Sequence, residues 1–344
     1  MRDQRLPYRA GRETIHLPHL CGGTVVHDAG LALYRVEAEG LEVETVAGKA
    51  TRHLRNEKQK NLVKLFDTAC YRHNRGQVWS DFMMMAAIAI SNRVDESNAP
   101  EREKLYLQLA GKYNEKELTC MTEMFAEIVV GIEEKPDQDF LGELFMCLEL
   151  SNSFAGQFFT PYSVCQFMAR CTAQKNHLLE QIEQKGWISV FDPACGAGAL
   201  LVAFANWCLE CDINYQTSVL FVAQDIDYTV GCMCYVTLSL MGCPGYVVVD
   251  DSIRRPSTSH DDRGLIPVHG PNVWYTPMYF RDVWHYRRTW WTMDRLVSAT
   301  AASMQAPEIT PEPEPEPKPA AKPKKVPAPA QKLKETSIGQ LTLF

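Results

Sequence analysis

Three short apolar runs mark the central part of the chain, at Ile188–Phe191, Val219–Ala223 and Tyr246–Val249. Each predicts a short buried strand, and the stretches between them, such as residues 200–209, predict helices. Strands that alternate with helices imply right-handed crossovers and a parallel sheet. We therefore expect an α/β fold here, within a domain spanning residues 154–300.

The flanking regions have other patterns. Residues 1–50 are irregular and strand-like, with the cleanest alternation at Leu41–Val46, and we treat them as an N-terminal extension. Residues 51–153 have helical spacing and predict a helical domain. Residues 301–336 are rich in Pro, Glu and Lys, cannot form a core, and predict a disordered linker before a terminal peptide at residues 337–344.

Composition narrows the class of protein. The 344 residues are 46% hydrophobic, which is ample for a core, and 35 basic against 42 acidic residues give a net charge of −7. The chain has no global electrostatic footprint for DNA, so any nucleic-acid contact must use a local patch. No apolar run approaches the length of a membrane span, and the N-terminus lacks a secretory signal. Together with twelve cysteines that read as reduced thiols, this predicts a cytoplasmic protein without a membrane partner.

Two cysteine pairs, Cys208/Cys211 and Cys232/Cys234, are the candidates for a metal site. A structural zinc site needs two well-spaced pairs whose thiolates converge tetrahedrally. One pair here falls near a helix end and the other in a strongly apolar segment. Core cysteines are the favoured interpretation, and we expect no metal.

The loop after the first predicted strand carries the candidate chemistry. Residues 191–200 read FDPACGAGAL, with Asp192 at the strand end and Gly196 and Gly198 before a helix. Glycines let a backbone approach a ligand closely, and a helix N-terminus offers free N–H groups. This pattern predicts a nucleotide-like cofactor. A nicotinamide is a poor fit, because Leu201 stands where the dinucleotide fingerprint has its third glycine.

A second motif, GQFFTP at residues 156–161, precedes this loop by about 30 residues. The two motifs in this order, with Asp139–Phe145 upstream, resemble the adenine-specific DNA methyltransferases typified by the methylation subunit of type I restriction–modification systems. The resemblance covers Asp139 to Ile253. It implies a Rossmann-like, S-adenosylmethionine-dependent methyltransferase sheet, apparently truncated, in a bacterial or phage protein that acts on DNA.

The resemblance also implies roles for individual residues. Asp192 would accept hydrogen bonds from the cofactor, and Asp225 would bind its ribose hydroxyls, with Asp227 as the runner-up. Asp251 would bind the adenine amine of the cofactor, and Thr160 its methionine end. The implied cofactor site is Thr160, Pro161, Asp192, Pro193, Gly196, Gly198, Asp225 and Asp251.

The catalytic motif departs from the family. Family members flip the target adenine and bind its amine with an (Asn/Asp/Ser)-Pro-Pro-aromatic tetrad, and no Pro-Pro pair follows Asp251. Asn272 and Trp274 are the nearest replacements for the amide and the ring. Residues 282–291 mix basic and aromatic side chains, which fits either a closing amphipathic helix or a single-strand-binding segment. Only about 25 residues separate Phe280 from the linker. They are too few for the remaining strands of a methyltransferase sheet or for a target-recognition domain. A specificity or complementing subunit is therefore a candidate partner.

The C-terminal residues form a separate motif. Gln340, Leu341, Leu343 and Phe344 lie in the segment QLTLF, which resembles the peptide by which bacterial proteins bind the DNA sliding clamp. The predicted linker could reach roughly 70–80 Å if extended.

Three functions stay open. The first is S-adenosylmethionine-dependent adenine-N6 methylation of DNA, with or without a partner that supplies target recognition or missing strands. The second is a catalytically silent S-adenosylmethionine-binding adaptor tethered to the clamp, and the third is methylation of RNA or protein.

Overall fold

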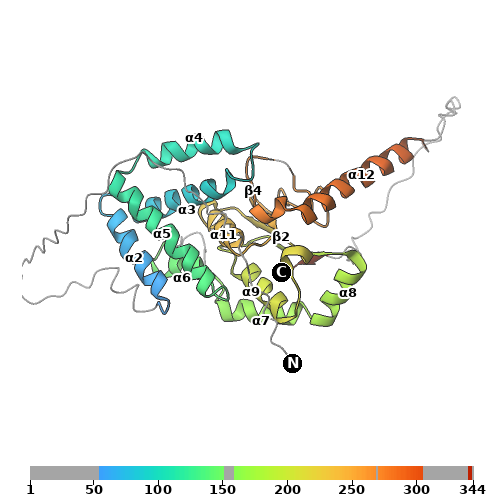
Figure 1. Cartoon of the computed structure of the whole chain (residues 1–344), viewed down its shortest axis with the longest axis horizontal. Coiled ribbons are helices and arrows are strands. Elements are labelled where there is room, and N and C mark those ends of the chain that lie inside the picture. The colour runs from blue at the N-terminus through green and yellow to red at the C-terminus, as the bar shows by residue number, and fades with distance from the viewer. Residues whose placement is uncertain (1–53, 151–158, 269, 305–339, 343–344) are drawn as a thin grey trace, which may run out of the picture. The chain divides into compact units, whose positions relative to one another are not determined.

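A computed structural model describes residues 54–150, 159–268, 270–304 and 340–342 of the chain (Figure 1). The predicted N-terminal extension, most of the predicted linker, and Leu343 and Phe344 lie outside these residues. The described chain begins with five helices, which confirm the helical pattern after Arg55. They are α2 (Glu57–Ala69), α3 (Arg75–Ser91), α4 (Ala99–Ala110), α5 (Glu115–Glu134) and α6 (Phe140–Cys147).

The sheet and its helices follow. They are α7 (Tyr162–Thr172), α8 (Lys175–Lys185), β1 (Ile188–Asp192), α9 (Ala199–Glu210), α10 (Tyr215–Ser218), β2 (Val219–Asp225), α11 (Tyr228–Leu240), β3 (Gly245–Val249), β4 (Val273–Tyr275), the 3-10 helix η2 (Pro277–Phe280), α12 (Asp282–Met304) and β5 (Gln340–Thr342). The three predicted strands are confirmed as β1, β2 and β3. The segment after Phe280 forms a helix that continues to Met304, into the region predicted as linker.

The strands form one sheet in the order β4-β3-β2-β1-β5. β1, β2 and β3 pair in parallel, as the alternating pattern predicts, and β4 pairs antiparallel to β3. β5, from the C-terminal segment, pairs in parallel with the other side of β1, with Ser189 opposite Gln340 and Phe191 opposite Thr342. Between Phe280 and Met304 the described chain contributes no strand to the sheet.

Both faces of the sheet are buried, which explains why its strands read as continuous apolar runs. Along β2, Phe221 and Ala223 face the larger core cluster, while Leu220 and Val222 face a second one. The first face is covered by α9 and α11, and the second by η2, the start of α12 and the loop before β4.

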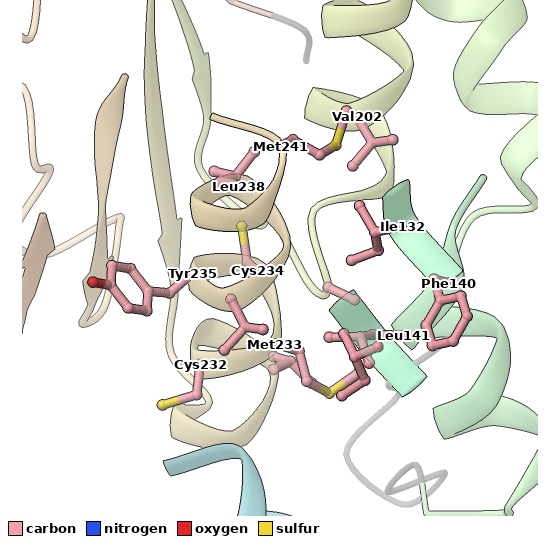
Figure 2. Close-up of a cluster of buried hydrophobic side chains, with 14 of the residues drawn as sticks. Ile132, Phe140, Leu141, Val202, Cys232, Met233, Cys234, Tyr235, Leu238 and Met241 are labelled. Atoms are coloured by element: carbon pink, nitrogen blue, oxygen red, sulfur yellow. The ribbon is translucent and has the colours of Figure 1, made fainter. Parts of the chain in front are cut away.

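The N-terminal helices and the sheet share one hydrophobic core. Figure 2 shows Met233 of α11 pointing toward Leu141 of α6, with Ile132 of α5 close by. Trp79 of α3 is fully buried and its Nε1 lies 3.4 Å from Met233 Sδ. This packing places α6 directly beside the start of the glycine loop.

Candidate functional site

The carboxyl ends of β1, β2 and β3 lie at the same edge of the sheet, because the three strands are parallel. Asp192 ends β1 and Asp225 ends β2. The Gly196 backbone N–H donates to Asp225 Oδ2 at 2.9 Å, and the Asp250 backbone N–H donates to the Asp225 carbonyl oxygen at 2.9 Å. Hydrogen bonds therefore connect the loops that follow all three strands.

Two glycines shape the loop between β1 and α9. Gly196 has φ +51° and Gly198, which precedes α9, has φ +91°. Side-chain-bearing residues adopt such angles rarely. A Cβ on Gly196 would also lie 3.3 Å from the ring of Phe159, which packs over the loop. Pro193, partly buried, follows Asp192 in the turn, where Asp192 Oδ1 accepts the Ala194 N–H at 3.1 Å.

Two buried carboxyl groups, those of Asp139 and Asp192, line one cavity of about 70 Å³ together with Thr160 and Gly196. Asp192 is 2% exposed and Asp139 is 6% exposed. Burial raises the pKa of each to about 7, which the backbone N–H bonds from Ala194 and Gly142 only partly oppose. Neither carboxylate forms an ion pair within the described residues.

A cavity with two such acids is suited to a cationic group. A cation would favour the ionised form of both carboxyls and thereby offset their burial. The volume fits a small charged group rather than a whole nucleoside, since small-molecule sites typically measure about 300–1,000 Å³. A second cavity, of about 1110 Å³, shares Asp139, Phe159 and Thr160 with the first, but neither Asp225 nor Ile226 lines it.

The Thr160–Pro161 segment lies beside the glycine loop, as predicted. Both residues are exposed, and Pro161 immediately precedes α7. The Thr160 carbonyl oxygen lies 3.7 Å from the thiol of Cys165. On the other side of α7's first turn, the Tyr162 hydroxyl donates to Asp137 at 2.6 Å. Thr160 therefore lines the cavity directly before the first turn of α7, which the contacts of Cys165 and Tyr162 hold in place.

The other predicted carboxylates differ in their availability. Asp225 accepts the N–H groups of Gly196 and Asp227, and a carboxylate has about four acceptor positions, so two remain for a ligand. Asp227 caps α11 by accepting the Thr229 N–H at 2.7 Å. Asp251 does not line the small cavity. Its Oδ1 accepts the Ile253 and Arg254 N–H groups, and the bond from Arg254 is the main cause of its lowered pKa.

Three residues at this edge were not singled out by the sequence. Asp139 lines the cavity while its Oδ1 caps α6 by accepting the Gly142 N–H. Gln224 is fully buried and holds the loop after β3: its Nε2 donates to the Asp250 and Arg255 carbonyls, and its Oε1 accepts the Ser257 N–H. Ile226 is 74% exposed directly after Asp225. A polar residue within an apolar run, and an apolar residue directly after the strand-end aspartate, are the sequence signals that could have identified the last two.

The two predicted catalytic residues are not exposed together. Trp274 is 3% exposed, and the Arg102 guanidinium lies 4.0 Å from the centre of its ring. Stacking on a base would require this ring to leave the core. Asn272 lies near the end of β3, where its Oδ1 accepts the Tyr228 hydroxyl at 2.8 Å. Tyr228 is 41% exposed and is the accessible ring beside Asn272.

The cysteines of the two candidate pairs are all buried, with exposed fractions of 1% or less. In the described part of the chain, no three or more His, Cys, Asp or Glu side chains gather as metal ligands. Among the described helices, none has the length and apolar character needed to cross a membrane.

Comparison with known proteins gives a match to one family model over part of the chain. The sequence model described as N-6 DNA Methylase matches this chain from residue 139 to residue 272, which is under half of its length. The methyltransferase resemblance is confirmed. The match begins at Asp139, in the cavity, and ends at Asn272. We refer to residues 139–272 as the methylase segment.

No curated protein matches the chain. Among solved structures, a protein from Listeria monocytogenes assigned to the class I S-adenosylmethionine-dependent methyltransferases is 18% identical, with a TM-score of 0.34. The alignment covers 62% of this chain and 56% of that protein, so the chain spans little more than half of its length.

S-adenosylmethionine is the cofactor that the N-6 DNA methylase family indicates. The residues of the methylase segment fit its chemistry. The buried carboxyls of Asp139 and Asp192 suit its cationic ammonium and sulfonium groups, and the free acceptor positions of Asp225 suit a ribose diol. The exposed side chain of Ile226 provides an apolar surface for a purine ring. When bound, this cofactor supplies an electrophilic methyl group.

Proposed function

We propose that the chain binds S-adenosylmethionine at the carboxyl edge of β1 and β2 and transfers its methyl group to the exocyclic amine of adenine in DNA. The observation that carries this proposal is the pair of buried carboxyls, Asp139 and Asp192, in one cavity with Thr160 inside the methylase segment. Two buried acids without an opposite charge nearby destabilise a fold when they ionise. A bound cationic cofactor would offset that cost by pairing with both carboxylates.

We further propose that Asn272 binds the target amine. Its amide lies past β3, beside the exposed ring of Tyr228, and an amide oxygen with a neighbouring ring is what recognition of a flipped base requires. Tyr228 replaces Trp274 as the stacking ring in this proposal, because the face of Trp274 is covered by Arg102. The two adjacent groups substitute for a tetrad that lacks its prolines.

A complementing subunit is part of the proposal. Among the described residues, the outer side of β1 pairs with the three residues of β5, and residues 282–304 form α12 rather than a strand. A partner that adds strands at this edge, beside β5 or in its place, would extend the sheet and supply target recognition. Type I restriction–modification systems, whose methylation subunits the chain resembles, combine several subunits.

Methylated-base sequencing tests the activity. The chain is expressed in a bacterial host that lacks adenine methylation, and the genome supplies every short target sequence. Methylated adenines in one sequence context are expected, and they should disappear in Asp192→Asn and remain in Asp262→Asn, a change at an exposed aspartate. Methyl groups in RNA or protein, and none in DNA, would contradict the proposed substrate.

The second candidate function is a catalytically silent adaptor that binds S-adenosylmethionine. The burial of Trp274 favours it, because a buried ring cannot stack on a target base. Calorimetry separates the two candidates: S-adenosylmethionine binding without methylation, in the presence of every candidate subunit, would support the adaptor.

We also propose that the C-terminal peptide binds a bacterial sliding clamp through Gln340, Leu341, Leu343 and Phe344. A double Leu343→Ala, Phe344→Ala variant should lose clamp in a pulldown, whereas Leu107→Ala, at an exposed position on α4, should retain it. Retention of the clamp by the double variant would refute this role.

A further inference from the structure

Helix α12 has apolar side chains on two opposite faces. On one face, Trp284 is fully buried and donates its Nε1–H to the Gln216 carbonyl at 2.8 Å, and Trp291 packs against the same cluster. The opposite face is exposed and has its own apolar row. This row, which we call the α12 stripe, consists of Tyr286, Trp290, Met293 and Val297, exposed by 70%, 74%, 57% and 69%.

The spacing of the α12 stripe is four, three and four residues. At about 100° per residue, the four side chains lie within roughly 60° of one another on the helix. Leu296, 64% exposed, extends the patch at one side. A helix on a protein surface normally turns polar residues outward, so a second apolar face indicates a second packing surface.

The area of this patch is large for a surface that stays in water. Aromatic side chains bury about 150–250 Å² each, and the exposed fractions of the five side chains then give an apolar patch of roughly 600 Å². Single exposed apolar residues are ordinary, whereas a contiguous patch of this size is at the upper end of what a monomer exposes, where patches are often functional.

We propose that the α12 stripe binds the same stripe of a second copy of this chain, with the two helices antiparallel. The spacing reads the same in both directions, so a two-fold axis between residues 291 and 292 brings Tyr286 opposite Val297 and Trp290 opposite Met293 of the other copy. Each large ring then meets a smaller side chain, as interdigitated packing requires. Two patches bury roughly 1,200 Å², which reaches the lower end of stable interfaces.

The charges of α12 argue against nucleic acid as the occupant. Single-strand binders place cations beside their exposed rings to contact phosphates. The Arg287 guanidinium instead donates to the Thr217 and Gly186 carbonyls at 2.6 and 2.9 Å, and Arg288 donates to the Tyr279 carbonyl. Both arginines are thus bound to the body of the protein. The stripe itself contains no charged residue.

Sedimentation equilibrium of the full chain tests the proposal between about 1 and 100 μM, the range in which an interface of this size should dissociate. The mass should rise from 38.9 kDa toward twice that value. Trp290→Glu should remain monomeric throughout while its circular dichroism is unchanged, because the residue is exposed. Leu107→Glu, a matched change on α4, should dimerise as the unmodified chain does.

Cross-linking tests the antiparallel geometry. In a Cys171→Ser background, which removes an exposed thiol, a Tyr286→Cys chain is mixed with a Val297→Cys chain and oxidised. Dimers should form in the mixture and not in either chain alone. A monomeric wild-type chain at every concentration, an undisturbed Trp290→Glu dimer, or equal cross-linking of each chain alone would overturn the proposal. If the stripe is protected from hydrogen exchange in a monomer, another segment of the same chain covers it and the dimer proposal is wrong.

Discussion

Replacing Asp192 by Asn should stabilise the cofactor-free protein at neutral and alkaline pH. Burial raises the pKa of this carboxyl from 3.8 to about 7. Between these values the folded state retains a proton that the unfolded state has lost, so the stability of the wild type falls as pH rises. Asn keeps the oxygen that accepts the Ala194 N–H and has no charge to bury. The stability of the variant therefore does not fall with rising pH in this way.

The size of the effect follows from the shift. About three pKa units correspond to roughly 4 kcal/mol at pH 8, about half of which has already appeared at pH 5.5. The stability advantage of Asp192→Asn should thus grow by roughly 2 kcal/mol between these pH values. Urea unfolding followed by tryptophan fluorescence at both pH values measures it.

The control is Asp262→Asn, which should leave stability unchanged at both pH values because its carboxylate is exposed. Calorimetry on the same samples should show that Asp192→Asn has lost S-adenosylmethionine. A stability difference between Asp192→Asn and the wild type that is independent of pH, or larger at pH 5.5, would refute the argument that Asp192 is a buried acid without a cationic partner.

Three further predictions concern the cofactor site and the sheet. S-adenosylmethionine should bind roughly 10- to 100-fold more weakly at pH 6 than at pH 8, because Asp192 and its neighbouring acid are ionised only above a pKa of about 7; calorimetry measures this. Gly245→Ala should abolish folding, since its Cβ would lie 1.8 Å from the Phe221 carbonyl oxygen; soluble yield and circular dichroism report it. Arg102→Met should cost about 3–5 kcal/mol in urea unfolding, because it leaves Asp95 buried without its partner.

The two substitutions have matched controls. Methionine substitution of Arg170, which pairs with Glu210 at the surface, should cost less than about 1 kcal/mol. Gly270→Ala should fold normally, since its Cβ would contact nothing within 4 Å. Cofactor affinity that is flat with pH, a folded Gly245→Ala protein, or equal costs at Arg102 and Arg170 would each contradict the corresponding argument.

The sequence predicts the parallel part of the sheet and the glycine loop because their causes are local. β1 to β3 are buried on both faces, so their apolar runs are continuous, and the glycines and Asp192 are adjacent in sequence. The closing helix after Phe280 is likewise visible from its own residues.

The remainder depends on partners far along the chain. β4 has only three residues, and its edge is held by Arg102, which donates to the Val273 carbonyl from 171 positions away. The same arginine covers the ring of Trp274, which the sequence alone offers as a base-stacking ring. Asp139 looks like an ordinary helix cap until α6 packs beside the glycine loop.

The pairing of β5 with β1 has a consequence for biosynthesis. β5 follows β1 by roughly 150 residues, and ribosomes add about 5–20 residues per second, so β1 emerges roughly 8–30 seconds before this strand is made. During that interval the outer N–H and C=O groups of β1 have no strand partner among the residues that the structure describes. Unpaired edges recruit other strands. During synthesis, the outer edge of β1 can therefore pair with a strand of a neighbouring subunit before residues 340–342 of its own chain are made.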